Sequence, residues 1–317
     1  MESTIDPVWW PSDVRLRFRL GEVPVASMKI PALVLNAHFT ELPLDSMEPP
    51  PPFERLSPPV ELLLSRSHPI ETALPRFTIL PHALRYVPHQ YRRHFIDMSG
   101  SFEGYMERFS SKSRSTVTRK VRKFLSLSGG TADFRTFTRP EEMAEFHGLA
   151  RGVSQKTYQE NLLGRGLPDG RDFVATMQTL ASQDRVRAYL LFHKGAAVAY
   201  LYCPVENGTI IYDHLGYDPE FKALSPGTVL QQLALERLFA EAKFKMFDFT
   251  EGEGAHKEFF ATGSNLCADI YYFRRTPRNL GLLGIHAGLA TISNRAVAAL
   301  DRLGLKKRIK ALIRARA

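Results

Sequence analysis

The clearest pattern of apolar and polar positions lies in the second half of the chain. A strand-like run covers residues 208–216, and alternation over residues 244–249 predicts a second strand. Between them, apolar residues recur at helical spacing and predict a helix over residues 227–242 with one buried face. They are Val229, Leu230, Leu233, Leu235, Leu238 and Phe239. The pattern therefore predicts the order strand, helix, strand for residues 208–249.

The same reading extends on both sides of this block. The turn residues Glu206-Asn207-Gly208 predict a hairpin between residues 198–204 and 208–216. Other strands are predicted over residues 94–98, 134–137, 186–193 and 268–275, and helices over 101–109, 113–127, 140–159 and 172–181. This order predicts an α/β (α+β) fold in which helices flank a mixed, largely antiparallel sheet.

The first half of the chain is less regular. Strand-like runs at residues 14–20 and 32–35 precede residues 49–59, where six prolines predict a stiff connector. Further prolines, including Pro88, predict an irregular segment as far as residue 93. We therefore expect an N-terminal region over 1–128, a main domain over 129–276 and basic C-terminal helices over 277–317.

Composition places the chain among soluble globular proteins. Of its 317 residues 44% are hydrophobic, and no apolar run reaches the length of a membrane span. Its start shows no pattern of a secretory signal. The two cysteines, Cys203 and Cys267, lie in apolar runs and are expected to be buried thiols. No Cys/His spacing suggests a metal site, so we expect no metal. Two buried thiols fit a reducing compartment, so we expect a cytoplasmic location, either free or with peripheral membrane contact.

The net charge of +9 is local rather than general. Residues 112–123 contribute +6 and residues 302–316 contribute +7, so the remaining residues carry a net charge of −4. Two basic segments, and not the whole surface, therefore decide which anionic partners the chain can take.

The predicted helix at residue 227 begins with residues that favour an anion. Ser225 is a good N-cap, and Pro226 suits the first helical position because its missing N–H costs nothing there. Gly227 lets another group approach the backbone closely, and the helix dipole favours negative charge. The same four residues, Ser225 to Thr228, are also typical of an ordinary capped helix.

Ionisable residues crowd the loop that follows the strand at residues 244–249. Asp248, Glu251, Glu253, His256 and Lys257 lie within ten positions beside Gly252 and Gly254. Clustered carboxylates raise one another's pKa, as a general base requires, although a solvated acidic loop has the same composition.

Together these segments resemble the GNAT acyltransferases. The resemblance rests on Gly216-Tyr217-Asp218-Pro219, Ser225-Pro226-Gly227-Thr228, Phe247-Asp248-Phe249, Glu251-Gly252 and His256-Lys257. More narrowly, the chain looks like the bacterial branch associated with cellulose and exopolysaccharide biosynthesis, which is similar to Fem-type peptidoglycan ligases. The resemblance implies a second, degenerate GNAT-like fold in the N-terminal half.

The resemblance also implies where an acyl donor would lie. The strands containing Tyr212 and Phe247 would splay apart around the pantetheine arm of acyl-CoA, and the following helix start would hold the pyrophosphate. The implied cofactor-binding residues are Ser225, Pro226, Gly227, Thr228 and Gln231. The chain departs from the usual Gln/Arg-x-x-Gly-x-Gly/Ala phosphate loop, and Fem-type relatives use aminoacyl-tRNA.

Acyl transfer needs a base, a group that polarises the thioester and an acid for the thiolate. Glu251 is the first candidate for the base and His256 the second, with Asp248 close by. Lys257 could stabilise an oxyanion, and Tyr212 could donate a proton to the leaving group. For the acceptor, the candidates are Lys156, Tyr158, Gln159 and Asp213.

Three functions remain open. The first is transfer of an acetyl or other acyl group from acyl-CoA to an amine or hydroxyl of a sugar, sugar-nucleotide or polysaccharide precursor. The second is a Fem-like ligase that uses aminoacyl-tRNA, with the helix at residues 113–127 as the RNA contact and nucleic acid otherwise not expected. The third is a non-catalytic GNAT-fold module of a polysaccharide assembly system. The basic segment at residues 306–314 could contact a membrane surface, or pack on the protein with its lysines in water.

Overall fold

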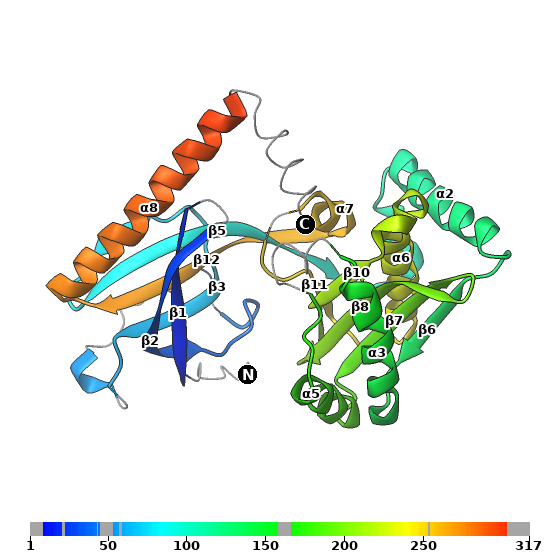
Figure 1. Cartoon of the computed structure of the whole chain (residues 1–317), viewed down its shortest axis with the longest axis horizontal. Coiled ribbons are helices and arrows are strands. Elements are labelled where there is room, and N and C mark those ends of the chain that lie inside the picture. The colour runs from blue at the N-terminus through cyan, green and yellow to red at the C-terminus, as the bar shows by residue number, and fades with distance from the viewer. Residues whose placement is uncertain are drawn as a thin grey trace. The chain divides into compact units, whose positions relative to one another are not determined.

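The computed structural model describes residues 9–20, 23–42, 44, 53–56, 59–157, 166–252 and 254–302 (Figure 1). Contacts divide the chain into two compact units, one of residues 1–93 with 265–317 and one of residues 94–264. These divisions differ from the boundaries expected at residues 128 and 276. The basic helix, which we expected in the N-terminal region, lies in the second unit.

The first unit is built on a sheet with the strand order β1-β2-β3-β12-β5. Its strands are β1 (Trp9–Leu20), β2 (Val23–Leu35), β3 (Leu62–Pro69), β12 (Gly263–Arg274) and β5 (Ala83–Asp97), with β4 (Phe77–Ile79) paired to β5. A short 3₁₀ turn, η1, covers Phe53–Arg55. The expectation of an irregular segment up to residue 93 is wrong. Pro88 lies inside β5, which a strand tolerates where the missing N–H faces no carbonyl.

Helix α8 (Pro277–Arg302) covers one face of this sheet. Leu283 packs in the same cluster as Val14, Leu16 and Phe18 of β1. The phenol of Tyr86 and Nδ1 of His286 lie 2.7 Å apart, which ties the helix to β5. None of the described helices is long and apolar enough to cross a membrane.

The second unit carries a mixed sheet with the order β11-β9-β8-β7-β6, extended at β11 by the last residues of β5. Its strands are β6 (Asp133–Phe137), β7 (Val186–His193), β8 (Ala196–Glu206), β9 (Thr209–Ile211), β10 (His214–Tyr217) and β11 (Met246–Asp248). All pairs are antiparallel except β9 with β11. Its helices are α1 (Phe102–Glu107), α2 (Ser111–Leu127), α3 (Met143–Ser154), α5 (Arg171–Ser182), α6 (Pro226–Ala240) and α7 (Ala255–Phe260), with 3₁₀ turns η2 (Pro140–Glu142) and η3 (Pro219–Leu224). The predicted fold class, a mixed sheet flanked by helices, is confirmed.

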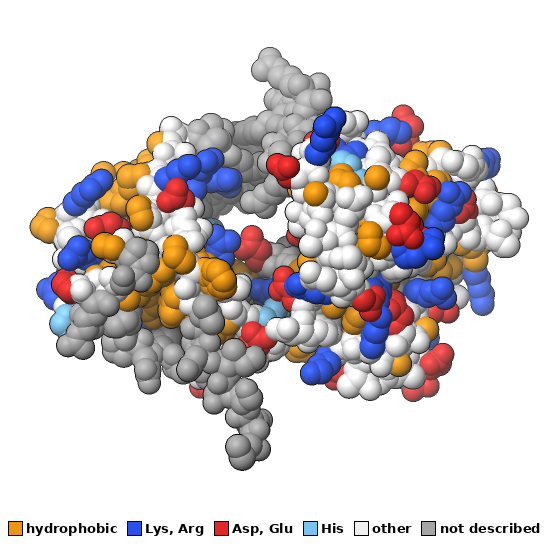
Figure 2. Space-filling model, turned by 90° about the horizontal axis from the view of Figure 1, so that it is seen from below, with side chains coloured by type: hydrophobic (Ala, Val, Ile, Leu, Met, Phe, Trp, Pro, Cys, Tyr) orange, Lys and Arg blue, Asp and Glu red, His pale blue; other side chains and the backbone are white. Residues whose placement is uncertain are grey.

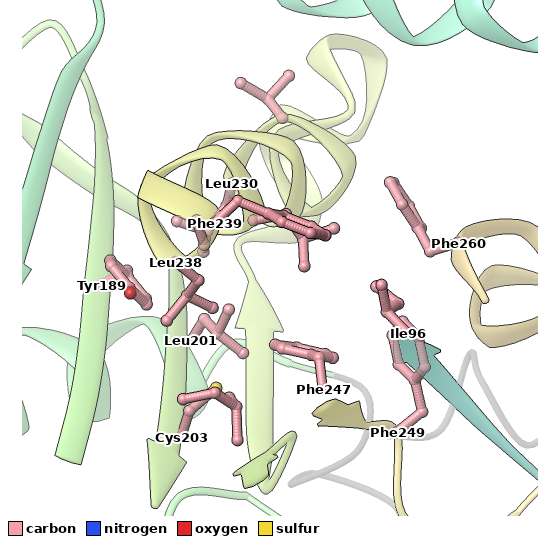
Figure 3. Close-up of a cluster of buried hydrophobic side chains, with 14 of the residues drawn as sticks. Ile96, Tyr189, Leu201, Cys203, Leu230, Leu238, Phe239, Phe247, Phe249 and Phe260 are labelled. Atoms are coloured by element: carbon pink, nitrogen blue, oxygen red, sulfur yellow. The ribbon is translucent and has the colours of Figure 1, made fainter. Parts of the chain in front are cut away.

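Alternation along β7 and β8 explains why helices lie on both faces of this sheet. Tyr189 and Leu191 of β7 lie on the face covered by α1, α2 and α6, in one cluster with Leu230 and Leu238. Figure 3 shows Tyr189 beside these two leucines. Their neighbours Ala188, Leu190 and Phe192 point to the other face, which α3 and α5 cover. Both faces are buried, so these strands read as continuous apolar runs. Cys203 and Cys267 are buried and free, as expected.

The hairpin expected at Glu206-Asn207-Gly208 is confirmed. Asn207 and Gly208 both have positive φ, 48° and 79°, as the two central residues of a type I′ hairpin turn require. Charged side chains of both signs are interspersed over the visible face of this unit, which fits basicity confined to particular segments (Figure 2).

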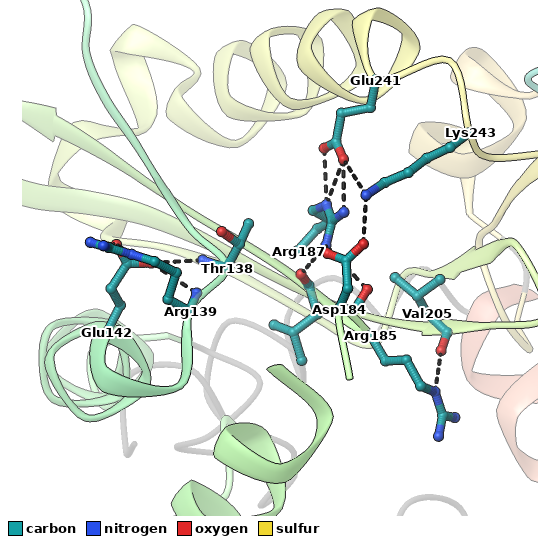
Figure 4. Close-up of polar contacts among 10 residues, drawn as sticks. Thr138, Arg139, Glu142, Asp184, Arg185, Arg187, Val205, Glu241 and Lys243 are labelled. Atoms are coloured by element: carbon teal, nitrogen blue, oxygen red, sulfur yellow. Dashed lines mark hydrogen bonds and ion pairs between the residues drawn. The ribbon is translucent and has the colours of Figure 1, made fainter. Parts of the chain in front are cut away.

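The largest buried side chain described in the second unit is charged. It is Arg187 on β7, which is 2% exposed. Its guanidinium lies 2.8 Å from Glu241 and 2.8 Å from Asp184, and it stacks over the Phe244 ring (Figure 4). Burial alone lowers the pKa of Arg187, but the hydrogen bonds to Glu241 and Asp184 outweigh it and raise the pKa. The two carboxylates therefore make burial of this charge tolerable.

We expect Glu241→Gln to lower the free energy of unfolding by about 2–3 kcal/mol, because it leaves a buried guanidinium short of a charged partner. Asp184→Asn is the matched control. Asp184 is 64% exposed, so its loss should cost less than about 1 kcal/mol. Urea unfolding of both variants measures the two values, and equal losses would contradict the assignment of Glu241 as the main partner.

Candidate functional site

Two neighbouring strands of the second unit separate after a very short pairing. Strands β9 and β11 pair in parallel over three residues each, from Thr209 opposite Met246 to Ile211 opposite Asp248. One further bond follows, from the Tyr212 N–H to the Asp248 carbonyl at 2.9 Å. Beyond it β10 pairs with β8, while the Phe249 N–H bonds to the His94 carbonyl. The strands containing Tyr212 and Phe247 therefore part where the resemblance led us to expect it.

The start of α6 differs from the expected capped helix. Ser225 has φ 51° and ψ 47°, a left-handed conformation that ends η3, and its side chain makes no capping hydrogen bond. Its carbonyl instead accepts from the N–H groups of Thr228 at 3.0 Å and Val229 at 3.1 Å. The expectation that the Ser225 side chain caps the helix is therefore wrong. Pro226 does occupy the first turn.

Gly227 lies close to a neighbouring strand of the same unit. A Cβ at this position would lie 3.3 Å from the Tyr217 ring and 3.7 Å from Leu215, both on β10. The close approach expected at Gly227 is thus made by β10. The Gly227 N–H has no backbone acceptor among the described residues, so it is available at the helix start.

Two lysines of α2 reach the junction of η3 and α6. Lys120 Nζ lies 3.5 Å from the Thr228 hydroxyl, and Lys123 Nζ donates to the Ala223 carbonyl at 3.1 Å. Lys120 is directed there because Val117 and Phe124, one turn away on either side, are buried on the same face of α2. Sequence reasoning placed Lys120 in a basic segment but not in the site. Its spacing from Val117 and Phe124 was the available signal.

The loop after β11 is folded by its own polar groups. The Asp248 carboxylate is fully buried, and its Oδ1 accepts the N–H of Thr250 at 2.9 Å. Lys257 Nζ donates to the backbone carbonyl of Glu251 at 2.6 Å, and the Glu251 side chain is exposed. Glu253 lies outside the described residues. The loop thus places Lys257 close to the end of β11.

His256, the second residue of α7, lies between this loop and the separated strands. Its ring is 5.0 Å from Phe260 and 6.5 Å from Tyr212, centre to centre. Burial, with the charges of Lys120 and Lys257, lowers the pKa of His256 to about 4. Its Nε2 is buried without a hydrogen-bond partner. At neutral pH the imidazole of His256 is therefore uncharged, and the charges of Lys120 and Lys257 both act to keep it so.

Tyr212 is the second buried ionisable group here. Its ring packs against Phe247 and Phe249, and burial raises the pKa of its phenol. The phenol therefore stays protonated at neutral pH. The candidate site of the second unit is thus made of five groups: Tyr212, Asp248, His256, Lys257 and Thr228 at the start of α6.

The proposed acceptor residues are placed differently. Lys156 Nζ forms an ion pair with the buried Asp218 carboxylate at 2.7 Å, which raises the pKa of Lys156. Asp213 is exposed and lies 3.5 Å from His214 Nε2. Tyr158 and Gln159 lie outside the described residues. Gln231 is fully buried on α6, and neither polar atom of its side chain has a partner.

No group of three or more His, Cys, Asp or Glu side chains is arranged to hold a metal ion in the part of the chain that the structure describes. Helix α2 carries the six lysine and arginine residues of the basic segment at residues 112–123. A surface groove of about 880 Å³ runs along this helix. It is lined by Ser111, Arg114, Ser115, Thr118, Arg119, Arg122, Lys123 and Ser126.

Residues 111–258 match the family model of the acetyltransferase (GNAT) domain. This segment lies within the second unit and includes α2, the separated strands, α6 and His256. The match supports transferase activity for this part of the chain.

Solved structures resemble the chain only distantly. FemX has 9% identity and a TM-score of 0.49, over 87% of this chain and 90% of that chain. The C-terminal domain of a putative lysylphosphatidylglycerol synthetase from Agrobacterium fabrum has 10% identity and a TM-score of 0.45, over 72% of each chain. L-PGS from Bacillus licheniformis has 13% identity and a TM-score of 0.43, over 71% and 72%. No curated protein matches the chain.

Burial of His256 makes a prediction about stability and pH. Its folded pKa of about 4 lies below the ordinary 6.5, so the unfolded chain binds the proton more readily between these values. The contribution of His256 to stability is therefore present above pH 6.5 and is lost as pH falls toward 4, by up to about 3 kcal/mol.

The variant His256→Gln should flatten the pH dependence of stability in this window, measured by urea unfolding at several pH values. The exposed His82→Gln serves as the control and should leave the slope of the parent protein unchanged. An unchanged slope in His256→Gln would show that the imidazole is not buried in its neutral form.

Proposed function

We propose that the chain is a GNAT-type acyltransferase that transfers an acetyl or other acyl group from acyl-CoA. The acceptor would be an amine or hydroxyl of a sugar, sugar-nucleotide or polysaccharide precursor. The observation that carries the proposal is the opening of β9 and β11 beside the start of α6, with Lys120 at Thr228 and an uncharged His256 nearby.

The start of α6 suits the pyrophosphate of the donor. The Gly227 N–H, the Thr228 hydroxyl and the Lys120 ammonium offer donors of three kinds, and the helix dipole adds to their effect. Lys123 supplies a second positive charge one turn further along α2. The pantetheine arm would then enter where the backbone of β10 leaves that of β11, since neither edge is paired to the other there.

The described side chains support one assignment of roles. We assign the base to His256 rather than to Glu251, because the imidazole is neutral with a buried, unpartnered Nε2, whereas the Glu251 carboxylate is exposed. The nucleophile attacks the thioester carbonyl and gives its proton to Nε2 of His256. The carbon–sulfur bond then breaks, and the phenol of Tyr212 donates a proton to the thiolate. Lys257 would stabilise the oxyanion.

On this assignment the other candidates have supporting roles. Asp248 shapes the loop through its bond to the Thr250 N–H. Lys156 compensates the buried Asp218, so it would position the end of α3 and not contact the acceptor directly. Asp213, exposed beside His214, would contact the acceptor hydroxyl or amine.

A Fem-like ligase that uses aminoacyl-tRNA is the second candidate, and one observation favours it. Arg114, Arg119 and Arg122 are exposed along the α2 groove and form no ion pair with the described residues. By contrast, Arg135, Arg139 and Arg187 each pair with a carboxylate. A row of unpaired guanidinium groups beside Ser and Thr hydroxyls suits successive phosphates of a nucleic acid.

Calorimetric titration with acetyl-CoA tests the first candidate. We expect binding to the parent protein and a loss of about tenfold or more in affinity for Lys120→Gln, because a charged hydrogen bond to phosphate contributes about 1.5–3 kcal/mol. Lys194→Gln, at an exposed turn between β7 and β8, is the matched control and should bind like the parent. Absence of binding to the parent protein would overturn the acyl-CoA proposal.

Filter binding with aminoacyl-tRNA tests the second candidate. If the α2 groove takes RNA, affinity should fall steeply with salt, and Arg119→Gln with Arg122→Gln should weaken binding and reduce the salt slope. Lys194→Gln is again the control. If the protein binds neither acetyl-CoA nor tRNA, the remaining candidate is a non-catalytic module of a polysaccharide assembly system.

A further inference from the structure

Helix α8 exposes a large apolar face away from its own sheet. Leu280, Ile285 and Ile292 are 48%, 62% and 59% exposed. Contiguous exposed apolar patches of this kind mark interaction sites. Gly281, Gly284 and Gly288 lie between them on the same face, and a Cβ at each would meet nothing within 4 Å. The outer face of α8, defined by these six residues, is thus exposed and has small residues at its centre.

This face is not the one that holds the helix to the protein. Leu283 is buried and Leu282, Ala287 and Leu289 pack in the cluster under β1, on the opposite side of the helix. His286 adds hydrogen-bond contacts to Tyr86 and to the Arg17 carbonyl. The helix is therefore apolar on both sides, although only one side has a partner within the described chain.

The formally charged residues of α8 up to residue 300, Arg278 and Arg295, are both positive. Arg278 and Arg295 lie near its two ends, are exposed and form no ion pair with the described residues. No Asp or Glu occurs from residue 277 to residue 300, and residues 302–316 add seven basic residues to a single acid at Asp301. An apolar face bordered only by cations is typical of a helix that lies on an anionic lipid surface.

We propose that the outer face of α8 docks on an anionic membrane surface. Leu280, Ile285 and Ile292 would enter the boundary between headgroups and acyl chains, and Arg278 and Arg295 would contact lipid phosphates. A second copy of the chain fits less well. Pairing two α8 helices through this face, in either direction, would bring arginines together with no carboxylate on the face to separate them.

Vesicle flotation of the full-length protein tests this proposal and does not depend on the acyl donor. We expect the protein to float with vesicles of phosphatidylcholine and phosphatidylglycerol in equal parts, and not with phosphatidylcholine alone. Added salt should weaken binding, because the arginine–phosphate attraction is screened. A parent protein that fails to float with the anionic vesicles overturns the proposal.

The double variant Ile285→Glu with Ile292→Glu identifies the face. Both side chains are exposed, so the fold should be retained, and circular dichroism and thermal unfolding check this. We expect vesicle affinity to fall more than about tenfold, since two apolar side chains are removed and two charges of the wrong sign are added. The control is Ile79→Glu, which changes an equally exposed isoleucine on β4 and should float like the parent.

Two further results would overturn the proposal. If the parent protein floats and the double variant floats equally well, the contact lies elsewhere on the chain. The other result is a parent protein that does not float and is a dimer by light scattering, together with a double variant that is a monomer. A second copy would then cover the outer face of α8. Loss of flotation in the double variant only, with the control unchanged, supports the membrane contact.

Discussion

The short parallel pairing of β9 with β11 is the constraint on which the candidate site depends. It lasts three residues on each strand, after which β10 stays with β8 and the chain beyond Asp248 turns toward β5. Buried backbone groups must find partners, so each strand takes a new neighbour here and the two strands separate. Tyr212 and Asp248 lie at this point, joined by a backbone hydrogen bond, and the Thr250 hydroxyl donates to the Tyr212 carbonyl at 3.4 Å.

Electrostatics around the opening follow from burial and not from the acidic loop. Lys120 and Lys257 act on His256 together with burial, and all three effects favour the neutral imidazole. The carboxylates that look prominent in the sequence serve other purposes. Asp248 bonds to its own loop, and Glu251 offers its backbone carbonyl to Lys257. The candidate site therefore combines two lysine ammonium groups with an uncharged imidazole.

The two units use their helices differently. In the second unit α6 is buried along most of its length between the sheet and the helices α1 and α2, so its start is held in place for the site. In the first unit α8 contacts its sheet through one face and leaves the other apolar. The basic residues of the two helices also differ in their surroundings. Lys120 and Lys123 of α2 contact the start of α6, whereas Arg278 and Arg295 of α8 lie beside an exposed apolar face.

The sequence by itself determined the fold class, the hairpin at Asn207-Gly208, helix α6 and the burial of both cysteines, because apolar periodicity and turn chemistry are local. It also placed His256, Lys257 and Thr228 among the candidates. Only the tertiary structure decided that Ser225 ends η3 in place of capping α6, that β5 continues through Pro88, and that Lys120 faces Thr228. Each of these depends on a partner distant in the chain, and no local pattern records which side chain or strand will be there.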